Sequence, residues 1–286
     1  MLALAATGGA MPAGAAAAAG VQGSRTAQSQ QQEVSSRWSF ETTEGVDPVT
    51  VPDEAGTANA LTLHGGAVPA QTWQVDTGGL ALDGTGHATA ATMPVDTSGS
   101  FTLTAWAQAA TAPTEAVTVI SAEGSDRAAV QVAFVPDERY PAGGLGAWRL
   151  SIAEQDMAGA RTVVLDTPQL SNALDWTHLA VAYDGTTKQA RLYVDGTLLE
   201  PTCPDDDGDG IPDDAACPDF QPWADEVTPF PATSFQVGRS GTGAHAGSYF
   251  SGLVDDVWIF QGALSEDQVR KLSVSFFDVP TVVPGT

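Results

Sequence analysis

One segment of the 286-residue sequence concentrates side chains that could bind a metal ion. Six aspartates stand within residues 205–214, and no lysine or arginine accompanies them. Asp205, Asp207 and Asp209 alternate with other residues, Gly210 follows them, and Asp213 comes three positions later. Alternate carboxylates on a tightly turning backbone can face one centre, and calcium, a hard cation, takes about six to eight oxygen ligands. The spacing therefore predicts a calcium-binding loop.

This acidic segment resembles a thrombospondin type 3 calcium repeat, in which runs of aspartate alternate with cysteines. A full EF-hand pattern is not present, because Ala216 occupies the twelfth position, where a bidentate glutamate would stand. The alternative is a solvated acidic loop, the usual role of a charge run, although six uncompensated aspartates repel one another. The resemblance implies these ligands: Asp205, Asp207, Asp209, the carbonyl of Ile211, and Asp213, with Asp214 replacing the twelfth ligand.

The two cysteines of the chain, Cys203 and Cys217, flank the acidic segment. A single pair in an exported protein most simply forms one disulfide, which here closes a loop of about 15 residues and contributes about 3 kcal/mol. A soft-metal site would need more cysteine or histidine ligands than this segment has. Because two cysteines would also suit a cytosolic protein, the expected disulfide supports export without proving it.

The rest of the chain has the pattern of β-strands, since apolar residues recur with a period of two from Arg37 onward. Asp184-Gly185 and Asp195-Gly196 favour the left-handed backbone of tight hairpin turns. A capping box at residues 265–268 predicts one helix, with Val269 and Leu272 on its apolar side. This predicts an all-β fold, a two-sheet antiparallel jelly-roll sandwich with one short C-terminal helix. The predicted strands cover residues 38–40, 60–63, 80–82, 87–90, 101–106, 117–122, 129–135, 147–153, 161–165, 176–183, 189–194, 235–237 and 253–260.

The two ends of the chain differ from its middle. Residues 1–35 are first rich in Ala and Gly and then in Gln and Ser, which resembles the apolar part of a secretory signal with a linker. A positively charged start is missing, because the first cation is Arg25, so a flexible tail without a targeting role is the alternative. We expect a domain over residues 36–279, with the acidic insertion at 201–220, a linker at 280–286, and a secreted or cell-surface location.

Four segments, in this order, resemble the laminin G-like or concanavalin A-like jelly roll that is common in bacterial secreted proteins. They are WSFE with LTL at 38–63, LALDG with FTLTAW at 80–106, WTHLAVAYDG with LYVDG at 176–196, and FSGLVDDVWIF at 250–260. The resemblance runs from about Trp38 to Leu272. Proteins of this fold class serve as glycan-binding, adhesion or accessory modules, and some glucanases share the fold, so the resemblance implies a fold and leaves the ligand open.

The same resemblance implies a second calcium site. In similar jelly rolls, acids of the last strand and of the segment after the first strand share a structural ion, and the corresponding residues are Asp255, Asp256, Asp53 and Glu41. Adjacent residues of a strand face opposite sides, so we expect at least one of the paired aspartates to point inward or to a rim of the sheet. A buried carboxylate needs a partner. The alternatives to an ion are loop amides, Arg37 or Arg239.

Composition and motifs narrow the class of function. Lys plus Arg number 11 against 35 Asp plus Glu, a formal net charge of −24, which argues against binding to nucleic acid or to an anionic membrane surface. No uninterrupted apolar stretch is long enough to span a membrane. The sequence holds no G-x-S-x-G or H-E-x-x-H motif, and no strand carries the alternating acids of the glucanases. We therefore expect a protein that is not an enzyme.

The prediction is a secreted, calcium-stabilised binding or adhesion module whose partner is a carbohydrate or a cell-surface protein. A structural or protein-interaction domain of a larger surface protein is the alternative, and a glycoside hydrolase is less favoured. Exposed aromatic rings would stack on sugar rings, whereas we expect Trp106, Trp176 and Trp258 to lie in the core. The candidate ligand-binding aromatics, in or near loops, are Trp73, Trp148, Trp223 and Tyr249.

Overall fold

The computed structural model describes residues 33–41, 49–55, 59–199, 222–243 and 246–274. The predicted signal-like segment, the acidic loop with its candidate ligands at 205–214, both cysteines and the 280–286 linker lie outside these ranges. The strands are β1 (Glu33–Trp38), β2 (Thr50–Val51), β3 (Leu61–His64), β4 (Val68–Pro69), β5 (Leu80–Asp83), β6 (His87–Ala90), β7 (Phe101–Ala109), β8 (Val117–Glu123), β9 (Ala128–Pro136), β10 (Leu145–Ala153), β11 (Thr162–Asp166), β12 (Ser171–Asn172), β13 (Thr177–Asp184), β14 (Gln189–Val194), β15 (Thr197–Leu198), β16 (Trp223–Ala224), β17 (Ser234–Val237) and β18 (Ser251–Gln261), and the helix is α1 (Glu266–Val274).

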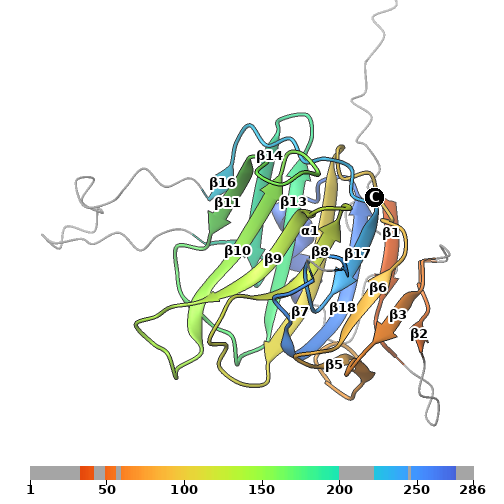
Figure 1. The fold of residues 1–286 in the computed structure, drawn as a ribbon, viewed down its shortest axis with the longest axis vertical. Helices are drawn as coiled ribbons and strands as arrows, with labels where there is room; N and C mark the ends of the chain where they lie inside the picture. The colour runs from red at the N-terminus through yellow and green to blue at the C-terminus, as the bar shows by residue number, and fades with distance from the viewer. Residues whose placement is uncertain (1–32, 42–48, 56–58, 200–221, 244–245, 275–286) are drawn as a thin grey trace, which may run out of the picture. The chain divides into compact units, whose positions relative to one another are not determined.

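The strands form two sheets that stack face to face (Figure 1). Sheet A has the order β15-β14-β13-β7-β18-β5-β4, with β1 also paired to β18 and β16 to β14. Sheet B has the order β11-β10-β9-β8-β17-β6-β3-β2, with β12 also paired to β10. Every pairing between these strands is antiparallel, so the predicted two-sheet jelly-roll sandwich is confirmed.

The period of two in the sequence decides which side chains enter the space between the sheets. In β10 the side chains of Trp148, Leu150 and Ile152 are buried, while the residues between them face outward. The neighbouring β9 contributes Val130 and Val132 to the same core. Each large apolar side chain buried in this way contributes about 1.5–3 kcal/mol relative to exposure.

Helix α1 covers the outer face of sheet A, on the side away from the viewer in Figure 1. The predicted capping box is confirmed, because the Ser265 amide donates to Gln268 Oε1 at 2.8 Å and the Gln268 amide approaches Ser265 Oγ at 3.4 Å. Val269 packs with Trp258 and neighbouring apolar residues of sheet A. This contact gives the outer face of sheet A a small second core.

The two predicted tight turns have different outcomes. Asp195 and Gly196 have φ angles of 50° and 80°, so the left-handed hairpin between β14 and β15 is confirmed. The prediction for Asp184-Gly185 is wrong, because neither residue is left-handed and Lys188, at φ 56°, closes a longer turn instead. The Asp184 carboxylate accepts the Thr186 amide at 2.8 Å and so stabilises this longer turn.

Candidate functional site: the outer face of sheet B

A row of polar side chains crosses the outer face of sheet B. The strand registers place one such residue from each of six neighbouring strands directly opposite the next. Along each strand the flanking residues point the other way, into the core, which fixes the row on the outside. The row consists of Ser151 (β10), Gln131 (β9), Ser121 (β8), Gln236 (β17), Thr89 (β6) and Thr62 (β3).

The connection from β17 to β18 folds back over the middle of this row. Gln236 Nε2 donates to the carbonyl of Gly241 at 3.2 Å, and Ser121 Oγ donates to the carbonyl of Arg239 at 2.9 Å. Mutual backbone hydrogen bonds of 3.1 and 2.9 Å between Ser240 and Gly247 close the connection into a hairpin. The connection therefore leaves part of the polar row open on each side.

On the β9–β11 side of this connection lies a hollow of about 280 Å³. Its size is just below the range of about 300–1,000 Å³ for sites that bind small molecules. Its lining is almost entirely polar or small, and its residues come from three strands, the β8–β9 hairpin and the β17–β18 connection. The lining residues are Asp126, Arg127, Ala128, Gln131, Ser151, Ala153, Thr162, Ser240 and Gly241.

Arg127 is held rigidly in the wall of the hollow. Its guanidinium donates to the carbonyl of Ala160 at 3.1 Å and to Thr162 Oγ1 at 2.6 Å, which ties the β8–β9 hairpin to the β10–β11 connection. The Asp156 carboxylate accepts three successive amides of the same hairpin, including those of Ser125 at 2.7 Å and Asp126 at 2.9 Å. These hydrogen bonds lower the pKa of Asp156, so that it stays ionised and holds the wall in place.

Glu123 supports the opposite wall from below. Its side chain is fully buried, and Oε1 accepts Ser240 Oγ at 3.1 Å and the Gly241 amide at 2.9 Å. Both partners line the hollow. Glu123, at the end of β8, therefore holds the part of the β17–β18 connection that forms one wall of the hollow.

On the other side of the connection, His64, His87 and Tyr249 form a partly exposed group of rings. The two imidazoles stack at 4.6 Å between centroids, and Tyr249 meets His87 edge-on at 6.1 Å. Arg239 donates to the Tyr249 hydroxyl at 3.1 Å. Burial, together with the charges of Arg239 and His64, lowers the pKa of His87 to about 4, so this ring is neutral near pH 7.

The four aromatic residues predicted to bind ligand lie in separate places. Tyr249 belongs to the ring group just described, and Trp223, on β16 at the edge of sheet A, lies under the Arg191 guanidinium at 5.9 Å. Trp73 stands in the β4–β5 connection with 68 % of its surface exposed. The prediction for Trp148 is wrong, because it lies inside β10, is 1 % exposed and packs edge-on against Phe134.

Asp256, expected to share an ion, pairs instead with an arginine. Arg37 Nε donates to Asp256 Oδ1 at 2.9 Å. The Arg37 guanidinium also lies over the Trp258 ring, 4.5 Å from its centre. Trp258 Nε1 in turn donates to Asp256 Oδ2 at 2.7 Å. The expectation that the two aspartates face opposite sides is wrong. A bulge between Asp255 and Trp258, with Asp256 at φ 45°, places both carboxylates on the outer side of sheet A.

The other acids expected at the second ion site stabilise loops. Asp53 accepts Ser36 Oγ at 2.7 Å and the Arg37 amide at 3.0 Å. Glu41 accepts the Thr77 amide at 2.9 Å and its hydroxyl at 2.6 Å. Within the described ranges no three acids, histidines or cysteines gather in a way that could hold a metal ion. The structure thus does not bring together the four residues of the expected second site.

Asp255 is fully buried and anchors the β4–β5 connection. Its Oδ2 lies 2.7 Å from Thr72 Oγ1 and accepts the Val75 amide at 3.0 Å. The Thr72 hydroxyl has one hydrogen and also faces the carbonyl of Gly78 at 2.5 Å, so a proton on Asp255 would supply the second hydrogen bond. Burial raises the pKa of Asp255 to about 7, so about half of these carboxyls carry a proton near neutral pH.

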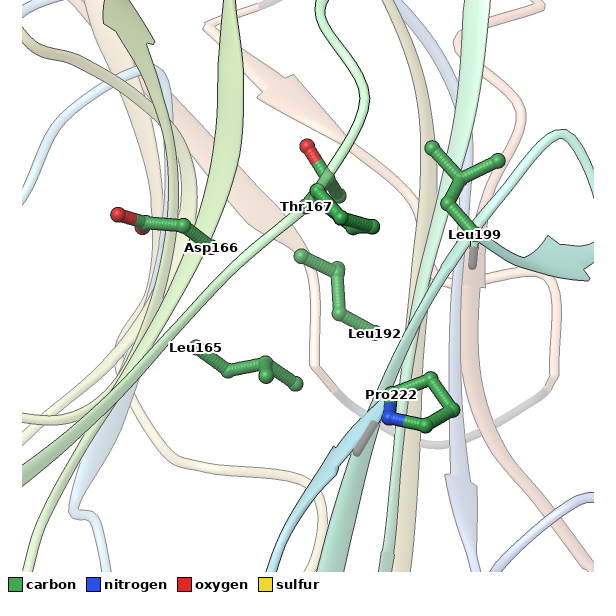
Figure 2. Close-up of a pocket in the computed structure, with 7 residues that line it drawn as sticks. Leu165, Asp166, Thr167, Leu192, Leu199 and Pro222 are labelled. Atoms are coloured by element: carbon green, nitrogen blue, oxygen red, sulfur yellow. The ribbon is translucent and has the colours of Figure 1, made fainter. Parts of the chain in front are cut away.

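A second, much smaller gap lies between the edges of the two sheets (Figure 2). The side chains of Leu165, Leu192, Leu199 and Pro222 surround it, and its volume of about 10 Å³ is at the limit for one water molecule. Leu199 and Pro222 are the described residues on either side of residues 200–221. The gap therefore lies between the two described residues that flank segment 200–221, and it is too small for an organic ligand.

Sequence reasoning missed the hollow and its lining. The sequence did contain one signal for it. Gln131 and Ser151 are polar residues at the outward-facing positions of strands whose inward-facing residues are apolar. Nothing in the linear sequence showed that Arg127 would stand beside them.

In the part of the chain that is described, no helix is long and apolar enough to cross a membrane.

Comparison with solved structures supports the architecture. Domain 4 of AbnA, a GH43 extracellular arabinanase from Geobacillus stearothermophilus, in complex with arabinotriose, matches with a TM-score of 0.51, 18% identity, and coverage of 85% of this chain and 100% of that chain. The botulinum neurotoxin type G receptor-binding domain matches with a TM-score of 0.54 and 11% identity, over 84% of this chain and 51% of that chain. The binding domain of Paraclostridial Mosquitocidal Protein 1 matches with a TM-score of 0.57 and 11% identity, over 86% of this chain and 52% of that chain. The chain thus spans about half of these two toxin domains, and at such identities the likeness shows the fold alone.

The sequence comparisons agree with this. No curated protein sequence matches the chain. Residues 82–203, which run from β5 to beyond β15, match the profile of the family described as the concanavalin A-like lectin/glucanases superfamily. Together with the two antiparallel sheets, this match supports a jelly-roll fold of the concanavalin A-like type for the described part of the chain.

Proposed function

We propose that the chain is a non-catalytic carbohydrate-binding module that holds a glycan in the hollow on the outer face of sheet B. The observation that carries the proposal is the polar row that opens into a rigid, ligand-sized hollow. The complex of the AbnA domain with arabinotriose supports it by likeness of fold.

The lining offers the hydrogen-bonding groups that sugar hydroxyls use. The Gln131 amide and the Ser151 and Ser240 hydroxyls can each both donate and accept, as can a sugar hydroxyl. Gln131 Nε2 is fixed by its bond to Thr118 Oγ1 at 2.6 Å, so its orientation is set before a ligand arrives. Pre-organised groups reduce the entropy that binding costs.

The charges of the chain favour a neutral glycan. The formal net charge of −24 repels polyanions, and the hollow itself holds one carboxylate, Asp126, beside one guanidinium, Arg127. Arg127 is already engaged with Ala160 and Thr162. We therefore expect neutral sugars to be bound and sulfated or sialylated ones to be rejected.

The same lining favours binding over hydrolysis. Glycosidases ordinarily use two carboxyl groups on either side of the scissile bond. Among the described residues that line the hollow, Asp126 is the only acid. The buried Glu123 is committed to Ser240 and Gly241.

Two further parts of the proposal concern residues outside the described ranges. We propose that the acidic segment 205–214 binds calcium and that a disulfide between Cys203 and Cys217 closes it. We also propose that the module acts outside the cell. The support is the aspartate spacing and the low content of cations.

The test is binding of the wild-type chain to linear arabinan, xylan, mixed-linkage β-glucan and galactomannan, followed by the variant Gln131→Ala/Ser151→Ala. We expect the double variant to lose at least tenfold in affinity, because two hydrogen-bonding side chains leave the hollow. Thr62→Ala/Thr89→Ala, on the same face beyond the β17–β18 connection, is the matched control and should bind like the wild type. Equal binding by all three proteins would place the glycan site elsewhere.

A further inference from the structure

Trp73 is the most exposed aromatic residue among those described, at 68 % of its surface. A tryptophan usually lies largely buried in a folded domain. The residues beside it are polar and also exposed, among them Gln71, Asp76 and Thr77. Trp73 is therefore an exposed apolar ring in a polar, solvent-exposed stretch of the chain.

The backbone at Trp73 is strained, and the loop around it is tightly held. Its φ is 59°, in the left-handed region that bulky residues rarely occupy. The Ala70 amide donates to the Gly79 carbonyl at 2.9 Å, and the Thr72 amide donates to the Thr77 carbonyl at 3.2 Å. At Gly78 an added Cβ would lie 2.5 Å from the Phe40 carbonyl oxygen, so the loop is seated directly on the chain that follows β1.

One buried acid, Asp255, and one exposed acid, Glu41, hold this loop. Asp255 accepts the Val75 amide, and the Val75 side chain is itself 1 % exposed. Glu41 accepts the amide and hydroxyl of Thr77. The loop is therefore built to keep Trp73 in one unfavourable conformation, and such strain is typical of sites that bind a ligand.

We propose that Trp73 is a second carbohydrate contact, a pre-organised platform for one face of a neutral sugar ring, separate from the hollow. The inference rests on the proposed function, since it names the same class of ligand. The exposed indole ring offers a flat apolar surface that matches the apolar face of a pyranose or furanose ring, and the exposed polar residues near it in sequence suit the hydroxyls at the rim of the sugar. A single ring offers far less than the area of about 800 Å² per partner of a stable protein interface.

The two contacts lie on opposite sides of the sandwich. The Trp73 loop is anchored on Asp255, which faces outward from sheet A, whereas the hollow lies on the outer face of sheet B. One short oligosaccharide cannot reach both. We therefore expect Trp73 to add to retention on an insoluble polysaccharide, where many chains are available, and not to the affinity for a soluble trisaccharide.

The experiment compares the wild type with Trp73→Gly, which removes the ring and suits the left-handed backbone. The probes are insoluble linear arabinan, measured by depletion, and soluble arabinotriose, measured by calorimetry. We expect Trp73→Gly to lose at least fivefold in retention on arabinan, to keep its affinity for arabinotriose, and to melt at the same temperature or up to about 4 °C higher. Tyr140→Ala is the matched control, because Tyr140 is 45 % exposed at another hairpin and should change nothing.

The outcomes separate this inference from the proposed function. If Gln131→Ala/Ser151→Ala removes all retention and Trp73→Gly retains like the wild type, the hollow stands and the second contact is wrong. If the wild type binds neither probe, this inference is overturned, whereas the proposed function fails only if xylan, mixed-linkage β-glucan and galactomannan are not bound either. A drop in melting temperature would make Trp73 a packing residue and overturn the inference. Wild-type sedimentation with phosphatidylcholine vesicles, lost in Trp73→Gly, would replace the sugar by a lipid surface and also overturn it.

Discussion

Replacing Arg37 by methionine tests the buried ion pair that stands where an ion was expected. Arg37 retains 13 % side-chain exposure and Asp256 6 %, and a single oxygen of Asp256 lies 2.9 Å from two guanidinium nitrogens. Removing one partner of a buried pair costs about 3–5 kcal/mol, because the other charge is left uncompensated. For a domain of this size we expect the melting temperature to fall by about 6–20 °C.

The assay is urea unfolding of Arg37→Met, Asp256→Asn and the double variant. Because the double variant carries no charge on either side of this pair, it should recover most of the lost stability, which gives a coupling of about 2 kcal/mol or more. Arg270→Met is the control, since its pair with Asp267 is exposed, at 54 % and 74 %, and should change stability by less than about 1 kcal/mol. A loss below about 1 kcal/mol for Arg37→Met, or additive losses in the double variant, would refute the reasoning.

Three other predictions follow from buried or acidic residues. Because the pKa of Asp255 is raised to about 7 in the fold, its contribution to stability is full below about pH 4 and is lost as the pH rises through 7. In urea unfolding, the free energy of unfolding of Asp255→Asn should therefore rise relative to that of the wild type between pH 4 and 8. A difference in free energy between the two proteins that does not change with pH would contradict the raised pKa of Asp255. Trp148→Ala should lose about 3–5 kcal/mol in the same assay, whereas a loss below 1 kcal/mol would be incompatible with its place in the core. Asp207→Ala/Asp209→Ala should remove one calcium-binding event in calorimetry, and an unchanged titration would end the calcium proposal for that loop.

The sequence was sufficient for the strands and the helix because both depend on local patterns. Alternation of apolar residues predicted β14 at residues 189–194 with its observed ends, and the Ser265 capping box predicted the start of α1. Trp148 was predicted to bind ligand as a residue in or near a loop, although it lies within the predicted strand 147–153 and is one of the alternating inward residues of β10.

The remaining errors come from contacts between distant parts of the chain. The bulge at Asp256 depends on Arg37, 219 residues earlier, which offers that carboxylate a partner on the outer face. The hollow likewise depends on how the β17–β18 connection folds over sheet B and rests on Glu123. Neither arrangement leaves a periodic trace in the sequence, so only the three-dimensional structure could reveal them.

The most direct test of glycan binding in the hollow is a calorimetric titration with arabinotriose of the wild type, of Gln131→Ala/Ser151→Ala and of Thr62→Ala/Thr89→Ala. Binding to the wild type and the second variant, with at least a tenfold loss in the first, is the predicted result. Undiminished binding to Gln131→Ala/Ser151→Ala would contradict it, as would an absence of binding to the wild type together with no retention on any of the four polysaccharides.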